Sequence, residues 1–153
     1  MELTTAMLAD AAHNVAGKLY ILGGQWDRLS AAALPVQHPT LSVVLVIRLE
    51  YNEAPRTYEL SIELTLDGRS QGIKAAGQFA VGHGPGQVHG APQFVPLAIP
   101  FNNLTFKTEG RYEWVITVAG NEVGRIPLEV THGIVPGIPP LAADQQPAEP
   151  DQG

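Results

Sequence analysis

Apolar and polar side chains alternate along several segments of this chain, and a period of two indicates β-structure. Between Tyr58 and Leu66 every second residue is apolar, and glutamate, serine or threonine fills the positions between. Successive side chains of a strand point to opposite faces, so this pattern predicts a half-buried strand, whereas a helix would scatter the same residues around its circumference. Asp67 and Gly68 follow at once and favour the positive φ angles of a tight hairpin. We therefore expect a return strand over Gln71–Val81.

A second alternating segment covers Tyr112–Val118, and Gly120 and Asn121 after it indicate another hairpin. The partner strand of this hairpin is predicted over Arg125–Val130, with its even-numbered residues facing inward. Pro127 has no N–H to donate within a sheet. This strand therefore lies at a sheet edge, or the proline nitrogen faces an unpaired side.

The remaining strands are predicted from apolar segments separated by glycine, proline and asparagine. Leu41–Leu49 is apolar at nearly every position, which is typical of a strand covered on both faces for part of its length. The other segments are Leu3–Ala11, Phe94–Ile99, Leu104–Lys107, and Lys18–Leu29 with a bend or bulge at Gly23 and Gly24.

About eight strands without a helical period predict an all-β fold, either a sandwich or a barrel. Tyr112 opens a strong strand just after a turn, where a tyrosine corner of the immunoglobulin-like sandwich would place it. An ordinary aromatic core residue is the alternative interpretation. We predict an immunoglobulin-like two-sheet β-sandwich whose sheets are held together by packing alone, because the chain contains no cysteine.

Charge and composition divide the chain into two parts. The formal net charge is −6, and half of it lies in the last 21 residues, which contain three acids and no lysine or arginine. Eight of those 21 residues are glycine or proline. Such a segment buries too little apolar surface to order itself. We therefore expect a sandwich domain over residues 1–132 and a Pro-rich acidic tail over 133–153 that is flexible and largely disordered.

The sequence also argues against several classes of partner and location. No cluster of lysine or arginine is present to neutralise phosphates, so nucleic-acid binding is not expected. The longest apolar stretch, Leu41–Ile47, is far shorter than the roughly 20 residues of a membrane-spanning helix. The N-terminus lacks the basic region of a signal peptide. We expect a soluble cytoplasmic protein with no membrane partner.

The segment Val81–Pro92 combines four glycines with two of the five histidines, His83 and His89. Together with His38 or His132, these imidazoles would suit zinc. Their spacing matches no known ligand signature, however, and the segment contains no carboxylate. The alternatives are a long mobile loop with its histidines in solvent, or a loop that binds a ligand or partner.

Trp26, Asp27 and Arg28 form a second candidate site, because tryptophan and arginine are enriched in interface hot spots. The alternative is that Trp26 packs in the core and its neighbours fix a bend. Asp10, in an otherwise apolar strand, would need a partner if it were buried, and Arg28 is one candidate. Glu113 and Glu129 are expected to face each other across the outer face of the last hairpin, with Arg111 and Arg125 as partners. We interpret them as a surface charge ladder.

Neither a nucleophile motif nor a phosphate-binding loop occurs in the sequence. The absence of any such signature favours a non-enzymatic role, and no cofactor is expected.

Several segments together resemble one family of small bacterial proteins of about 140 residues. They are AMLAD (Ala6–Asp10), GKLYILGG (Gly17–Gly24), WDRL (Trp26–Leu29), QHP (Gln37–Pro39), PFNNLTF (Pro100–Phe106) and GRYEWVI (Gly110–Ile116). The similarity extends over roughly residues 3–131 and leaves the tail outside. The family is a domain of unknown function. The resemblance therefore implies a small sandwich domain of the bacterial cytoplasm and transfers no catalytic residue.

From these observations the favoured hypothesis is a non-enzymatic binding or assembly module, with a protein partner or self-association. A metal-binding protein or metal-dependent enzyme centred on His83 and His89 is one alternative. A structural component of a larger particle is another.

Overall fold

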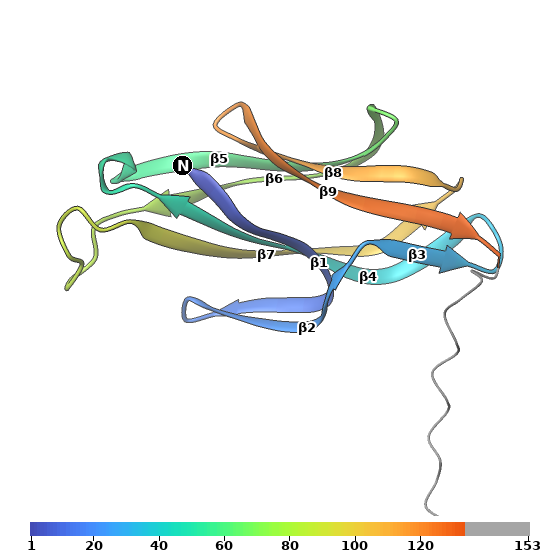
Figure 1. Ribbon diagram of the computed structural model, residues 1–153, viewed down its shortest axis with the longest axis horizontal. Helices are drawn as coiled ribbons and strands as arrows, with labels where there is room; N and C mark the ends of the chain where they lie inside the picture. Colours follow the sequence, from blue (N-terminus) through green and yellow to red (C-terminus); the bar gives the residue numbers. More distant parts are fainter. Residues whose placement is uncertain (134–153) are drawn as a thin grey trace, which may run out of the picture.

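Nine β-strands form two sheets that pack face to face (Figure 1). One short 3-10 helix, η1, lies where the chain passes from one sheet to the other. The computed structural model describes residues 1–133. Their elements are β1 (Glu2–Val15), β2 (Lys18–Trp26), β3 (Arg28–Ala31), β4 (Val36–Leu49), η1 (Tyr51–Glu53), β5 (Arg56–Leu66), β6 (Arg69–Val81), β7 (Gln93–Phe106), β8 (Gly110–Val118) and β9 (Asn121–His132).

The strand order is that of an immunoglobulin-like sandwich. One sheet has the order β2-β1-β4-β7 and the other β3-β9-β8-β5-β6. This places β4 beside β7 and β5 beside β8 beside β9, as strands B and E and strands C, F and G are placed in immunoglobulin domains. The strand β3 adds to β9 in parallel, whereas the other pairs are antiparallel. The predicted fold class is confirmed.

The core lies between the sheets and is centred on Trp114, whose side chain is fully buried. The ring of Phe101, from β7, lies 4.5 Å from the Trp114 ring and so links the two sheets. Two residues before Trp114, the Tyr112 hydroxyl donates a 2.7 Å hydrogen bond to the backbone carbonyl of Thr108. Tyr112 therefore forms the predicted tyrosine corner.

Both predicted hairpins are present. Asp67 and Gly68 have φ angles of 50° and 76° and connect β5 to β6. The second hairpin turns at Ala119 and Gly120, with φ angles of 50° and 81°, one residue earlier than the predicted Gly120 and Asn121. These positive angles match the right-handed twist of the paired strands.

Pro127 lies in β9 with its nitrogen on an unpaired side, one of the two predicted alternatives. The N–H of Glu129 donates 2.8 Å to the carbonyl of Asp27, next to β3. Backbone groups alternate along a strand, so the Pro127 nitrogen points to the same side two residues earlier. There β3 has not yet begun, because its pairing with β9 starts at Arg28 and Glu129.

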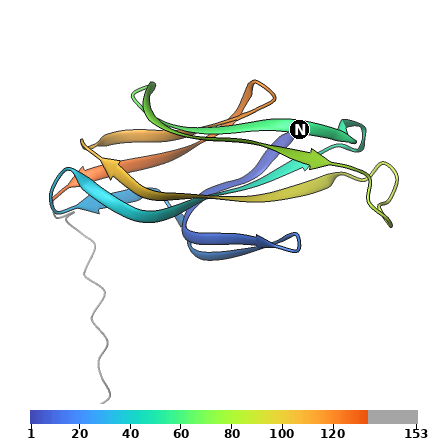
Figure 2. The same cartoon turned by 180° about the vertical axis from the view of Figure 1, so that it is seen from behind.

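The predicted double coverage of Leu41–Leu49 is confirmed, and the second cover is a hairpin. The β4 strand lies between β1 and β7, with Val43 and Leu45 packed in the core between the sheets. On the opposite face Val44 packs against Ala12 and Leu19 of the β1–β2 hairpin. This hairpin forms a partial third layer beneath its own sheet, visible from both sides (Figure 2).

Hydrogen bonds fix the hairpin on that face. The Asn14 side-chain amide donates 2.7 Å to the carbonyl of Pro96 in β7, and the Thr40 hydroxyl donates 2.9 Å to the carbonyl of Asp10. Gly23 lies opposite Asp10 with a φ of 60°, and a Cβ at Gly23 would lie 2.3 Å from the Asp10 carboxylate. Only glycine fits this close approach.

The structure corrects three details of the strand prediction. Lys18–Leu29 is two strands in different sheets, β2 and β3, because the chain crosses between the sheets at Asp27. Phe94–Ile99 and Leu104–Lys107 form the single long strand β7, since its pairing with β4 continues through Pro100. The sandwich therefore has nine strands, not about eight.

Residues 1–133 contain no helix that is long and apolar enough to cross a membrane. The predicted disorder of the tail falls on residues 134–153, outside the described part of the chain.

Replacing Tyr112 by phenylalanine removes the hydroxyl that bonds to the Thr108 carbonyl and leaves the packed ring in place. We expect Tyr112→Phe to lower the free energy of unfolding by about 1 kcal/mol, because the hydrogen bond to the Thr108 carbonyl is lost. Chemical denaturation checks this value. Tyr20→Phe is the matched control, since the Tyr20 side chain is 58% exposed. An equal loss in both variants would contradict the structural role of the corner.

Candidate functional site

The glycine- and histidine-rich loop between β6 and β7 packs on the η1 turn through three aromatic rings. The ring centroid of Tyr51 lies 4.2 Å from that of His83 and 4.5 Å from that of His89. The sequence separates Tyr51 from both histidines by about thirty residues or more, so this contact depends on the fold. The two predicted site histidines are thus brought together, although both remain exposed to solvent.

Hydrogen bonds also hold His83 in place. Its Nε2 lies 3.0 Å from the carbonyl of Ala54, and its Nδ1 lies 3.4 Å from the side-chain amide of Gln87. The Gln87 amide nitrogen is buried without a partner. With the Gln87 amide oxygen and nitrogen exchanged, a neutral His83 donates from Nε2 to the Ala54 carbonyl and accepts at Nδ1 from the Gln87 amide nitrogen.

The histidines predicted to complete a metal site lie elsewhere in the fold. His38 packs against Trp26, with 5.7 Å between the ring centroids, and His132 ends β9. Within residues 1–133 no three histidine, aspartate or glutamate side chains gather as a metal site would require. Metal binding by His83 and His89 stays a prediction.

Trp26, Asp27 and Arg28 lie where the chain crosses from one sheet to the other. The Trp26 side chain is half-buried and packs against the main core. Arg28 forms an exposed ion pair with Glu129, with 3.5 Å between nitrogen and oxygen. Asp10 is exposed and faces Gly23, so the predicted need for Arg28 as its partner does not arise.

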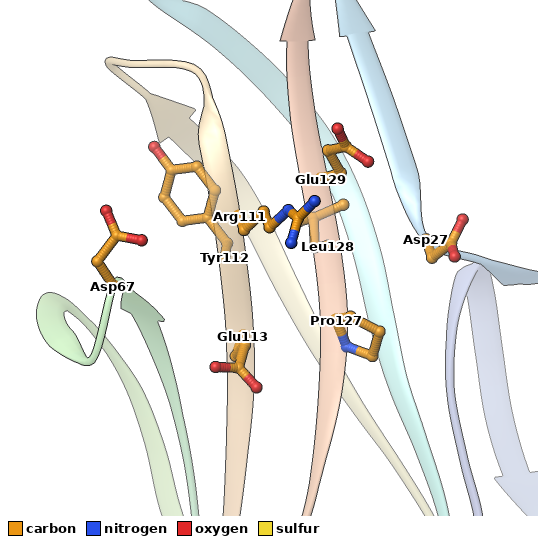
Figure 3. Close-up of a pocket in the computed structure, with 8 residues that line it drawn as sticks. All are labelled: Asp27, Asp67, Arg111, Tyr112, Glu113, Pro127, Leu128 and Glu129. Carbon is orange, nitrogen blue, oxygen red and sulfur yellow. The ribbon is translucent and has the colours of Figure 1, made fainter.

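An open hollow of about 500 Å³ lies on the outer face of the five-stranded sheet (Figure 3). Four carboxylates and Arg111 line the hollow. Tyr112 also lines it, but the Tyr112 hydroxyl already donates a hydrogen bond to the backbone carbonyl of Thr108. Glu113 pairs with Arg125 at 3.2 Å, beside the Arg28–Glu129 pair. These groups form a surface charge ladder, but two details of the expected one are wrong. Glu113 lies opposite Pro127 rather than Glu129, and the ion-pair partner of Glu129 is Arg28, not Arg111.

The β1–β2 hairpin presents an unusual apolar surface. Ala12 and Leu19 face the sheet, so the residues next to them along each strand point to solvent. We call the six residues on this solvent side the hairpin outer face. They are Ala11, His13, Val15, Lys18, Tyr20 and Leu22. Within it Val15 is 55% exposed, Tyr20 58% and Leu22 72%. Large apolar side chains gathered in this way are typical of a binding surface.

The free edge of β2 adjoins this face, and it lacks the usual protection against pairing. Natural edge strands carry charges, prolines or bulges, or are very short. In β2 the run Leu19–Gln25 contains neither a charge nor a proline, and its one bulge lies at its end, at Gln25. The β2 edge is therefore open to another strand along Leu19–Leu22.

The three other sheet edges are better protected. The β7 strand contains Pro96 and Pro100, and β3 has only four residues. The β6 strand contains Arg69 and Lys74 in its first half. Its uncharged second half, Ala75–Val81, is weakened by Gly77 and exposes no large apolar side chain. Unprotected backbone and exposed apolar side chains thus coincide only on the β1–β2 hairpin among the described residues.

Comparison with known proteins places the chain in a family. The sequence model of a family of unknown function, DUF6941, matches residues 4–131. The chain belongs to this family. The family match runs from β1 to β9 and contains the hairpin, the glycine- and histidine-rich loop and the hollow. As the resemblance implied, it ends before the Pro-rich tail. No curated protein and no solved structure matches the chain.

Sequence reasoning missed the hairpin outer face. Its signal was the run LYIL over Leu19–Leu22, in which apolar residues occupy both faces of a strand next to an exposed turn. The sequence predicts a strand over this run but no exposed apolar surface, because sequence alone does not show which face a neighbouring sheet covers.

Replacing Tyr51 by alanine removes both ring contacts that hold the glycine- and histidine-rich loop on η1. We expect Tyr51→Ala to increase amide hydrogen exchange across residues 82–92 several-fold, because the loop loses its main packing contacts. Hydrogen-exchange mass spectrometry measures this directly. Asn52→Ala, an exposed neighbour on the same turn, is the control and should leave the loop unchanged. Equal exchange in wild type and Tyr51→Ala would show that the ring contacts do not hold the loop.

Proposed function

We propose that this protein is a non-enzymatic assembly module that binds another protein through its β1–β2 hairpin. The observation that carries the proposal is the coincidence of an unprotected strand edge with exposed Val15, Tyr20 and Leu22. A partner that adds a strand to β2 gains backbone hydrogen bonds from the edge and apolar contacts from the side chains beside it.

The charged groups of the molecule support the same function. Two of the carboxylates that line the hollow in Figure 3, Glu113 and Glu129, form exposed ion pairs with Arg125 and Arg28, as on an ordinary solvated surface. The hairpin outer face, by contrast, contains one lysine and no acid among its six residues. The apolar surface is therefore spatially separate from the charged one.

Replacing Leu22 by aspartate places a charge in the centre of the apolar surface and tests the proposal. Immobilised wild type and Leu22→Asp are compared for the proteins that they retain from an extract of the source organism. We expect retention on Leu22→Asp to fall about tenfold or more, since burial of one leucine contributes about 1.5–3 kcal/mol. Quantitative mass spectrometry of the bound proteins gives the ratio.

Gln78→Asp is the matched control, because Gln78 is an exposed residue on the β6 edge strand. It adds the same charge to a different edge and should retain the wild-type set of proteins. The melting temperatures of both variants establish that they are folded. If wild type, Leu22→Asp and Gln78→Asp retain the same proteins in the same amounts, the hairpin is not the binding surface.

A further inference from the structure

We propose that the protein bound by the β1–β2 hairpin is a second copy of this chain, which pairs β2 with β2 in antiparallel orientation about a two-fold axis at Ile21. The inference rests on the proposed function and names its partner. Two hairpins joined in this way form one four-stranded sheet with the order β1-β2-β2-β1. Such an interface is isologous, like that of most homodimers.

The turn of the hairpin decides which backbone groups face the free edge. Ala16 and Gly17 have φ angles of 51° and 76°, which define a two-residue turn flanked by the pair Val15 and Lys18. In such a hairpin the two flanking residues exchange both of their backbone hydrogen bonds. From there along the strand, the N–H and C=O groups of successive residues point alternately toward the partner strand and away from it. Lys18 therefore bonds toward β1, whereas the N–H and C=O groups of Leu19 and Ile21 point to the free edge.

Symmetry then restricts the register. Residues with outward backbone groups pair with one another, so odd-numbered positions of one β2 oppose odd-numbered positions of the other. An axis at Ile21 centres the pairing on the exposed part of the strand. Ile21 exchanges both hydrogen bonds with Ile21 of the second copy. Tyr20 then stands directly opposite Leu22 of the second copy, and Leu22 opposite Tyr20.

The pairs formed by Tyr20 and Leu22 are those in which side chains approach most closely. They are non-hydrogen-bonded pairs, whose Cα atoms lie about 4.5 Å apart. Tyr20 is 58% exposed and Leu22 72% exposed in the single chain, so each covers apolar surface of the other. Aromatic and aliphatic side chains on opposite strands stabilise a sheet. Self-pairing thus covers the two most exposed apolar side chains of β2.

The distribution of charge favours a second copy over a charged peptide. Leu19–Gln25 has no charge, and this register places Lys18 opposite Gly24 of the second copy. No like charges meet across the axis, although each chain has a formal net charge of −6. The hairpin outer face offers a charged peptide only one lysine and one histidine, and no carboxylate, as partners for its charges. A second copy always brings a matching uncharged edge.

The chain has no cysteine, so a single introduced thiol reports symmetric pairing directly. In the proposed dimer the Cα atoms of the two Ile21 residues lie about 5.5 Å apart, so a short bifunctional maleimide reaches both introduced thiols. We expect this reagent to convert Ile21→Cys to a covalently linked dimer. Gln78→Cys, on the β6 edge, should stay monomeric in a denaturing gel. Failure of Ile21→Cys to link, or equal linking of both variants, would overturn the proposed pairing.

A charge-exchange experiment tests the register independently of thiol chemistry. Light scattering of the wild type should give twice the 16.3 kDa mass of the chain. The double substitution Tyr20→Lys with Leu22→Lys places like charges opposite each other, and so does Tyr20→Glu with Leu22→Glu. We expect each double variant alone to be monomeric and their equimolar mixture to form dimers. A mixture that stays monomeric, with both variants folded by circular dichroism, would overturn the register.

The outcomes separate this inference from the proposed function. A monomeric wild type whose captured proteins still depend on Leu22 overturns the second copy as partner and leaves the hairpin as a binding surface. A monomeric wild type whose captured proteins do not depend on Leu22 overturns both.

Discussion

The packing of two sheets around Trp114 is the interaction on which the rest of the structure depends. No disulfide joins the sheets, so their separation and angle are set by side chains alone. Trp114 from one sheet and Phe101 from the other meet at the centre, and the Tyr112 hydroxyl ties the start of the same strand to the preceding turn. With the sandwich fixed in this way, the immunoglobulin-like order places β2 at one end of its sheet.

The β1–β2 hairpin covers an apolar side chain on the outer face of the β4 strand. Val44 points away from the core, and a sheet face that exposes valine gains from any apolar cover. The second half of β1 folds back together with β2 and supplies this cover, with Ala12 of β1 and Leu19 of β2 against Val44. A two-stranded hairpin has two faces, however, and only one can pack on the sheet. Tyr20 and Leu22 are the consequence, because they lie on the face that no other residue within 1–133 covers.

The sequence predicted the elements governed by local periodicity and missed the relations between distant elements. The β5 and β8 strands were predicted because one face of each is buried and the other is solvated, so that apolar and polar residues alternate along the sequence. The division of Lys18–Leu29 between two sheets was not predicted, because the residue pattern of a strand does not show which sheet the strand joins. The site was predicted less well than the fold. Tyr51 meets His83 and His89 only through the fold, and the apolar Leu22 reads as core until its neighbours are known.

The central claim is that the β2 edge of this member of a family of unknown function, with its exposed side chains, is completed by another strand. The most direct measurement is the amide hydrogen exchange of Ile21 as a function of protein concentration, followed by nuclear magnetic resonance. If a second copy completes the edge, the protection of the Ile21 amide rises with concentration as dimers form, whereas the amides of the β6 edge do not change. Exchange at Ile21 that stays equally fast at every concentration, in a protein otherwise fully folded, would contradict pairing with a second copy.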